Sequence, residues 1–258
     1  MRDAAPALPF RVYRRLRAVL LYPKYRQYLA QIKIGHPLHG VPTRIVGDAS
    51  EDPREFFDHY DAFAYWAANI IFAKGRRLSV LDVGSVKMMN AVLSAAHDVT
   101  SLVLSDCGDR ISKVKYVTHD VASRLPCTDH SFDIFTSMVS LPLIGLGRYG
   151  DKLDATCLMN FIAELARVMK QNGELIFSLC LGKNVLNFNN GWFFDMPMIE
   201  RLFGDWQLID CLVDNASSPK GGSKVVFERF SKDSALGDRK LGDYRVIFLH
   251  FRRRPPPQ

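Results

Sequence analysis

Residues 79–85 read Ser-Val-Leu-Asp-Val-Gly-Ser, and this stretch decides how the rest of the chain is interpreted. A short apolar run that ends at a glycine is typical of a buried strand leading into a turn. A helical pattern over 88–96 follows, and then a predicted strand at 102–104, within the sequence LVLSD that ends at Asp106. Because strands and helices alternate, we expect a parallel sheet with helices on both faces.

The alternation continues to the end of the chain. Further strands are predicted at 115–117, 132–137, 175–179, 207–213 and 245–251, and further helices at 55–73, 154–170 and 196–202. We expect Asn172-Gly173 to end the helix 154–170 with a left-handed cap. The last two strands, joined by 214–243, read as a hairpin, so one of them runs antiparallel. The predicted fold class is α/β, with a Rossmann-like, seven-stranded, mostly parallel sheet, helices on both faces and a C-terminal antiparallel strand.

Composition excludes several classes of protein. The chain has 258 residues, of which 48% are hydrophobic, so it can bury a sizeable core without disulfides or metal. The apolar run 18–22 is far shorter than the roughly 20 residues that span a bilayer, and arginines interrupt the first segment where a secretory signal needs apolar residues. Five scattered cysteines with no CxxC pair indicate reduced thiols and predict a cytoplasmic protein.

The net charge of +7 is located in residues 1–35, the first part of a predicted N-terminal arm, residues 1–53. Residues 1–35 carry eight basic side chains and one acidic one, whereas the other 223 residues carry equal numbers of both. We therefore expect a basic helical arm before the domain at 54–252 and a tail at 253–258, and no nucleic-acid partner. A basic amphipathic helix over 10–34 is compatible with a peripheral membrane surface, a protein partner or packing on its own domain.

Several motifs together resemble those of the class I S-adenosylmethionine-dependent methyltransferases. They are SVLDVG (79–84), LVLSD (102–106), THD (118–120), ASRLPCTDHSFDIFTS (122–137) and ELARVMKQNGELIFS (164–178). The resemblance covers about 75–251. More narrowly, LDVGS (81–85), IGLGRYGD (144–151) and a later FN (188–189) look like an uncharacterised methyltransferase-like family that is often associated with polysaccharide biosynthesis.

The resemblance implies where S-adenosylmethionine would bind. Gly84 and Ser85 would form the turn whose backbone approaches the methionine moiety, and Asp82 would orient that turn. Asp106 would accept the ribose hydroxyls, and Asp120 would contact the adenine amino group. The alternative interpretation is that these residues only cap strand ends and that no ligand binds.

The substrate would lie after the strand 132–137. Arg148 is a candidate to hold a phosphate or carboxylate, and Tyr149 or Asp151 to orient or deprotonate a hydroxyl. In the alternative interpretation, Asp151 lies at the N-terminal cap of the next helix with Arg148 as its ion-pair partner. Asn189 and Trp192 are candidates to wall the pocket, with the indole stacked on a sugar ring. The histidines show no metal-binding spacing, so we expect no metal site.

These observations predict a methyltransferase that uses S-adenosylmethionine to methylate a hydroxyl of a sugar or glycan intermediate. The alternative is a catalytically inactive domain of the same fold that acts as a binding or scaffold module. Two departures from the narrower family favour the alternative. Where its pattern has a Glu-His and a His-Arg pair, this chain has Pro142-Leu143 and Gly191-Trp192.

Overall fold

The computed structural model describes residues 58–106, 108–109, 111–187, 191–214, 227–230 and 244–255, with seven single positions before residue 35. The chain divides into two compact units, Met1–Glu55 and Phe56–Gln258, and only the second is described here. Most of the predicted arm and its helix lie outside the described residues, so their roles stay predictions. None of the described helices is long and apolar enough to cross a membrane.

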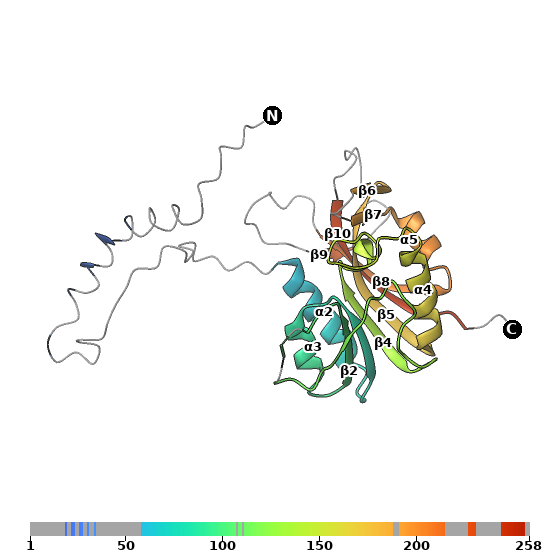
Figure 1. The fold of residues 1–258 in the computed structure, drawn as a ribbon, viewed down its shortest axis with the longest axis horizontal. Coiled ribbons are helices and arrows are strands. Elements are labelled where there is room, and N and C mark those ends of the chain that lie inside the picture. Colours follow the sequence, from blue (N-terminus) through green and yellow to red (C-terminus); the bar gives the residue numbers. More distant parts are fainter. Residues whose placement is uncertain are drawn as a thin grey trace. The chain divides into compact units, whose positions relative to one another are not determined.

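One sheet forms the centre of the second unit (Figure 1). Its strands are β1 (Ser79–Val83), β2 (Asp98–Val103), β3 (Lys115–Thr118), β4 (Phe132–Met138), β5 (Met169–Gly182), β8 (Trp206–Asp214), β9 (Phe227–Arg229) and β10 (Tyr244–Arg253). They lie in the order β3-β2-β1-β4-β5-β10-β8-β9. The first five are parallel, whereas β10 runs antiparallel to both β5 and β8. The predicted fold class is confirmed, and the short edge strand β9 adds an eighth strand to the seven expected.

Helices cover both faces of this sheet (Figure 1). The helices α2 (His59–Phe72) and α3 (Lys87–Leu93) lie on one face, and α4 (Cys157–Val168) and α5 (Met196–Leu202) lie on the other. A 3-10 turn, η1 (Leu141–Leu143), follows β4, and a small separate hairpin joins β6 (Val185–Asn187) to β7 (Gly191–Phe193).

The alternation of side chains along each strand divides the apolar residues between two cores. We call the core under α2 and α3 the α2 core, and the core under α4 and α5 the α4 core. In β1, Val80 lies in the α2 core and its neighbour Leu81 lies in the α4 core. In β4, Ile134 and Phe135 divide in the same way. Because a strand exposes successive side chains to opposite faces, a continuous apolar run fills both cores at once. Burial of each such side chain contributes roughly 1.5–3 kcal/mol.

The predicted end of the helix 154–170 is wrong. Helix α4 ends at Val168, and β5 begins at Met169, so Asn172 and Gly173 lie in a strand. The register between β4 and β5 shifts at this point, which accommodates the extra residues as a bulge. Backbone N–H groups of the turn before β4 bond to the last carbonyls of α4, and this pairing draws the chain directly into the sheet. The Asn-Gly signal is therefore overridden by tertiary pairing.

Candidate functional site

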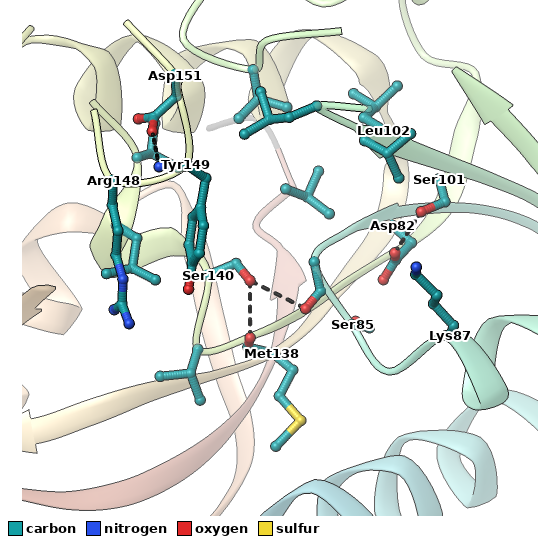
Figure 2. A pocket seen from close by; sticks show the side chains of 18 of the residues that line it. Asp82, Ser85, Lys87, Ser101, Leu102, Met138, Ser140, Arg148, Tyr149 and Asp151 are labelled. Carbon is teal, nitrogen blue, oxygen red and sulfur yellow. Dashed lines mark hydrogen bonds between the residues drawn. The ribbon is translucent and has the colours of Figure 1, made fainter. Parts of the chain in front are cut away.

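A cavity of about 650 Å³ opens at the carboxyl ends of the parallel strands (Figure 2). It lies where the strand order reverses between β1 and β4, which is the usual ligand position in open α/β sheets. Its walls come from the ends of β1 to β4, the loop 144–151, helix α2 and the strands β7 and β10. The volume lies in the range of small-molecule and cofactor sites.

Asp82 lies at the base of the cavity and is 1% exposed. Its carboxylate accepts hydrogen bonds from Asn90 Nδ2 (2.7 Å), Ser101 Oγ (2.9 Å) and Thr136 Oγ1 (2.9 Å). Burial raises the pKa of this carboxyl, and hydrogen bonds from neighbouring side chains oppose that shift. Asp82 therefore ties β1 to α3, β2 and β4, and its oxygens are engaged within the protein rather than presented to a ligand.

The turn after β1 requires glycine because of its own neighbours. Gly84 has φ +73°, and a Cβ atom there would lie 2.6 Å from Ser140 Cβ and closer still to the hydroxyl. The Ser140 hydroxyl lies within hydrogen-bonding distance of the carbonyl oxygens of Gly84 (3.1 Å) and Met138 (3.0 Å), as Figure 2 shows. Ser85 lines the cavity beside this turn. The close approach of Ser140, just after β4, is by itself enough to require glycine here, and the predicted approach of a ligand at Gly84 stays a prediction.

The acids after β2 and β3 differ in what they offer a ligand. Asp106 is exposed at the cavity, and its Oδ1 accepts a hydrogen bond from Gly108 N (2.9 Å). Asp120 also lines the cavity, but its two oxygens accept from Ala122 N and Lys152 N, each at 2.9 Å. Asp120 thus joins the end of β3 to the loop that follows η1, and of these two carboxylates Asp106 is the more accessible.

Asp151 organises its own loop. One carboxylate oxygen accepts from the backbone N–H groups of Gly145 (3.0 Å) and Gly147 (3.2 Å), and the other accepts from Tyr149 N (3.1 Å). These three backbone donors engage both oxygens of the carboxylate and hold the loop 145–151 in its turn. Asp151 therefore has a structural role in this loop, and its catalytic role stays a prediction. The predicted helix cap is not observed either, because α4 has Thr156 as its N-cap residue.

Arg148 stands at the rim of the cavity over the ring of Tyr149. Its guanidinium carbon lies 5.1 Å from the ring centre, which is within the range of a cation–π contact. The expected ion pair with Asp151 is absent from the described residues, in which Arg148 has no ion-pair or hydrogen-bond partner. Tyr149 is 63% exposed. Both side chains therefore remain available to a ligand.

One of the two remaining substrate candidates, Trp192, is not brought to the cavity. Trp192 does not line it and instead stacks on Phe194, with ring centres 6.1 Å apart and planes at 9°. Asn189 lies outside the described residues. The next residue in the strand, Phe193, points to the opposite side, where it lines the cavity. Its ring centre lies 4.7 Å from that of Tyr244.

Several polar and aromatic lining residues were not among the site candidates from the sequence. His59 and Tyr60 come from the start of α2, His119 from the end of β3, and Tyr244 from the start of β10. Nε2 of His119 is buried and has no hydrogen-bond partner among the described residues, so a ligand with a donor or acceptor would satisfy it. No spacing in the sequence links these positions, because they meet only through the sheet topology.

Thiol chemistry is not supported at this site. Cys180 lines the cavity, but burial raises the pKa of its thiol to about 12, so it stays protonated near neutral pH. The four described cysteines form no disulfide. In the described part of the chain, no group of three or more His, Cys, Asp or Glu side chains is placed to hold a metal ion.

A family model matches more than half of the chain. Residues 78–227 match a family model described as "Caenorhabditis protein of unknown function, DUF268". That description does not mention polysaccharides, so the narrower resemblance stays a prediction. No curated protein matches the chain.

Two similar solved structures are methyltransferases. One is the 1,6-didemethyltoxoflavin-N1-methyltransferase of Burkholderia thailandensis with bound 1,6-didemethyltoxoflavin and S-adenosylhomocysteine (16% identity, 97% of this chain and 92% of that chain, TM-score 0.48). The other is the N-methyltransferase NodS of Bradyrhizobium japonicum WM9 in complex with S-adenosylhomocysteine (12% identity, 80% of this chain and 93% of that chain, TM-score 0.49).

Proposed function

The chain belongs to the DUF268 family, and from that premise we propose that it is an S-adenosylmethionine-dependent methyltransferase acting on a hydroxyl of a sugar or glycan intermediate. One observation carries the proposal. The cavity at the reversal of strand order presents an exposed carboxylate, Asp106, at the end of β2, and an unsatisfied buried nitrogen, His119 Nε2, at the end of β3. These are the places where nucleotide-binding α/β sheets hold a ribose and a base.

The residues present fit the cofactor. Asp106 supplies acceptors for the two ribose hydroxyls, and His119 with the apolar side chain of Val121 suits the adenine ring. The turn Gly84-Ser85 borders the space left for the methionine moiety. When bound, S-adenosylmethionine supplies an electrophilic methyl group, and the protein's task is to hold the acceptor in line with it and exclude water.

Methylation of a hydroxyl also needs a group that accepts its proton. The carboxylates Asp82, Asp120 and Asp151 are occupied by hydrogen bonds from the protein itself. Of the two histidines that line the cavity, His119 is assigned to the adenine ring, so His59 is the one whose ring nitrogen is left to accept this proton. Proton transfer would then depend on a histidine that lies outside the quoted motifs.

A binding module without catalysis is the second candidate. It is favoured by the engagement in its own loop of Asp151, one of the two candidate proton acceptors. It is opposed by the preserved cavity, because a site that has lost its ligand is under no constraint to keep about 650 Å³ of space and an unsatisfied buried nitrogen.

Calorimetric titration with S-adenosylmethionine and S-adenosylhomocysteine tests the proposal. We expect saturable binding that Asp106→Asn weakens about tenfold or more, since hydrogen bonds to a charged group contribute about 1.5–3 kcal/mol. The control is Asp98→Asn, which changes an exposed acid at the other end of β2 and should leave the affinity unchanged. Ligand at 100 times its dissociation constant should also stabilise the protein by about 2.7 kcal/mol. Absence of binding at millimolar cofactor would reject the proposal.

A further inference from the structure

The cavity contains two cationic side chains without ionic partners. Lys87, the first residue of α3, and Arg148, in the loop after η1, both line it, and Figure 2 shows them on opposite sides of the pocket. Neither forms an ion pair with any described residue. None of the lining acids, which are Asp82, Asp106, Asp120 and Asp151, forms an ion pair with either of these two cations.

The charges of the proposed cofactor account for only one of these cations. S-adenosylmethionine carries a single anionic group, the carboxylate of its methionine moiety. Lys87 lies three residues after Gly84 and on the same side of the pocket as Ser85, so it is the cation nearest to that moiety. Arg148 belongs to the other side, where the acceptor would lie, and it is left with no anionic partner.

The surroundings of Arg148 suit a ring with an acidic group. Its guanidinium lies over the Tyr149 ring, which fixes the plane of its donors, and a planar guanidinium binds carboxylate or phosphate through two parallel hydrogen bonds. Tyr60, Tyr149 and Tyr244 are 47%, 63% and 48% exposed and line the same cavity. Exposed aromatic faces with hydroxyl tips bind ligands that have one apolar face and polar edges.

We propose that the methyl acceptor is an acidic sugar, whose carboxylate or phosphate is bound by Arg148 and whose ring lies against the tyrosines that line the cavity. This inference rests on the proposed methyltransferase function and adds the class of its substrate. It also gives Arg148 a role as a specificity-determining residue that the acceptor contacts directly.

The test uses the full chain, first saturated with S-adenosylhomocysteine and then titrated with small probes by calorimetry. The probes are glucuronate, glucose 6-phosphate, glucose and inorganic phosphate. We expect one of the two acidic sugars to bind at least about tenfold more tightly than glucose and than inorganic phosphate, since hydrogen bonds to a charged group are worth about 1.5–3 kcal/mol. The acid that binds identifies the anionic group as carboxylate or phosphate.

Two variants of the same loop make the result specific to Arg148. Arg148→Gln should reduce the affinity for the acidic sugar to that for glucose. Lys152→Gln removes the same charge from a side chain that pairs with Asp154 and does not line the cavity, so it should change nothing. Equal binding of glucose and the acids, equal binding of inorganic phosphate, no binding of either acid, or an equal effect of both variants would overturn the inference. Failure of S-adenosylhomocysteine to bind in the first step would instead reject the proposed function.

Discussion

The two ends of the parallel strands use their charged groups in opposite ways. We call the side where these strands begin the amino edge, and the side where they end, at the cavity, the carboxyl edge or cavity edge. At the amino edge, buried Glu174 of β5 accepts from His250 (2.8 Å) and Lys74 (2.8 Å) and forms an ion pair with Arg252 (3.0 Å). At the carboxyl edge, Arg148 faces the cavity with no ionic partner among the described residues. The fold depends on buried charges keeping their partners, whereas charges left without partners are available to bind ligands. The amino edge therefore serves stability, and the cavity edge serves recognition.

Backbone strain follows the same division. Of the described residues other than glycine, two have positive φ, His130 at 51° and Val139 at 47°. Histidine is enriched in this conformation, whereas a β-branched residue there is a true outlier. His130 lies at the amino edge, just before β4, and Val139 lies at the cavity, just after β4. The greater strain is thus stored at the cavity, as is typical of functional sites.

The largest effect is expected at the amino edge. Glu174→Gln removes the charge that neutralises three basic side chains at a residue only 5% exposed. Breaking a buried ionic network in this way costs about 3–5 kcal/mol, which corresponds to a fall in melting temperature of roughly 10 °C. Calorimetric melting should show this fall, while S-adenosylhomocysteine affinity at 20 °C should be unchanged.

The exposed pair Arg77–Asp98 provides the control, since Asp98→Asn should leave the melting temperature almost unchanged. Loss of ligand affinity in Glu174→Gln would show that the two edges are not independent.

The same carboxylate sets the acid stability of the fold. Burial alone would raise the pKa of Glu174, but its hydrogen bonds and ion pairs with His250 and Lys74 lower it from 4.5 to about 2. Because the folded pKa lies below the unfolded one, the stabilisation is complete above pH 4.5 and is lost as the pH falls from 4.5 towards 2. The loss amounts to about 3 kcal/mol. Urea unfolding at pH values from 6 to 2.5 should show that wild type and Glu174→Gln converge as the pH falls. A difference that stays constant with pH would contradict this assignment.

The fold was predictable from the sequence, but the allocation of polar groups in the site was not. Apolar runs and turn residues define β1 and α5 almost residue by residue, because both are decided by local patterning. The carboxylates are different, since whether Asp106 or Asp151 faces a ligand depends on which backbone N–H groups lie nearby. His59 reaches the cavity only because α2 packs beside β4, and no local pattern encodes that contact.

A smaller effect, on both stability and binding, is expected at the turn after β1. Gly84→Ala places a methyl group against Ser140 at a φ of +73°, whereas Gly75 has a φ of +63° and open space around it. Conformational strain alone costs about 1–2 kcal/mol at either position. We therefore expect Gly75→Ala to lose only this amount and keep its affinity for S-adenosylhomocysteine. Gly84→Ala should lose more stability and bind the ligand at least about tenfold more weakly. The double variant Gly84→Ala/Ser140→Gly should recover part of both losses; no recovery would show that the contact with Ser140 is not the cause.

The smallest change in stability is expected at Val139, and its small size is the informative result. Replacing a half-buried valine by glycine normally costs about 2 kcal/mol, from lost apolar burial and greater freedom of the unfolded chain. At Val139 the same change also releases backbone strain of about 1–3 kcal/mol, so we expect the free energy of unfolding to stay within about 1 kcal/mol of wild type. Val114 is the matched control, because it is also half-buried against the α2 core but lacks a positive φ. Urea unfolding should therefore show a clear loss for Val114→Gly and little for Val139→Gly. Equal losses would mean that Val139 stores no strain, and the contrast between the two edges would then rest on their charges alone.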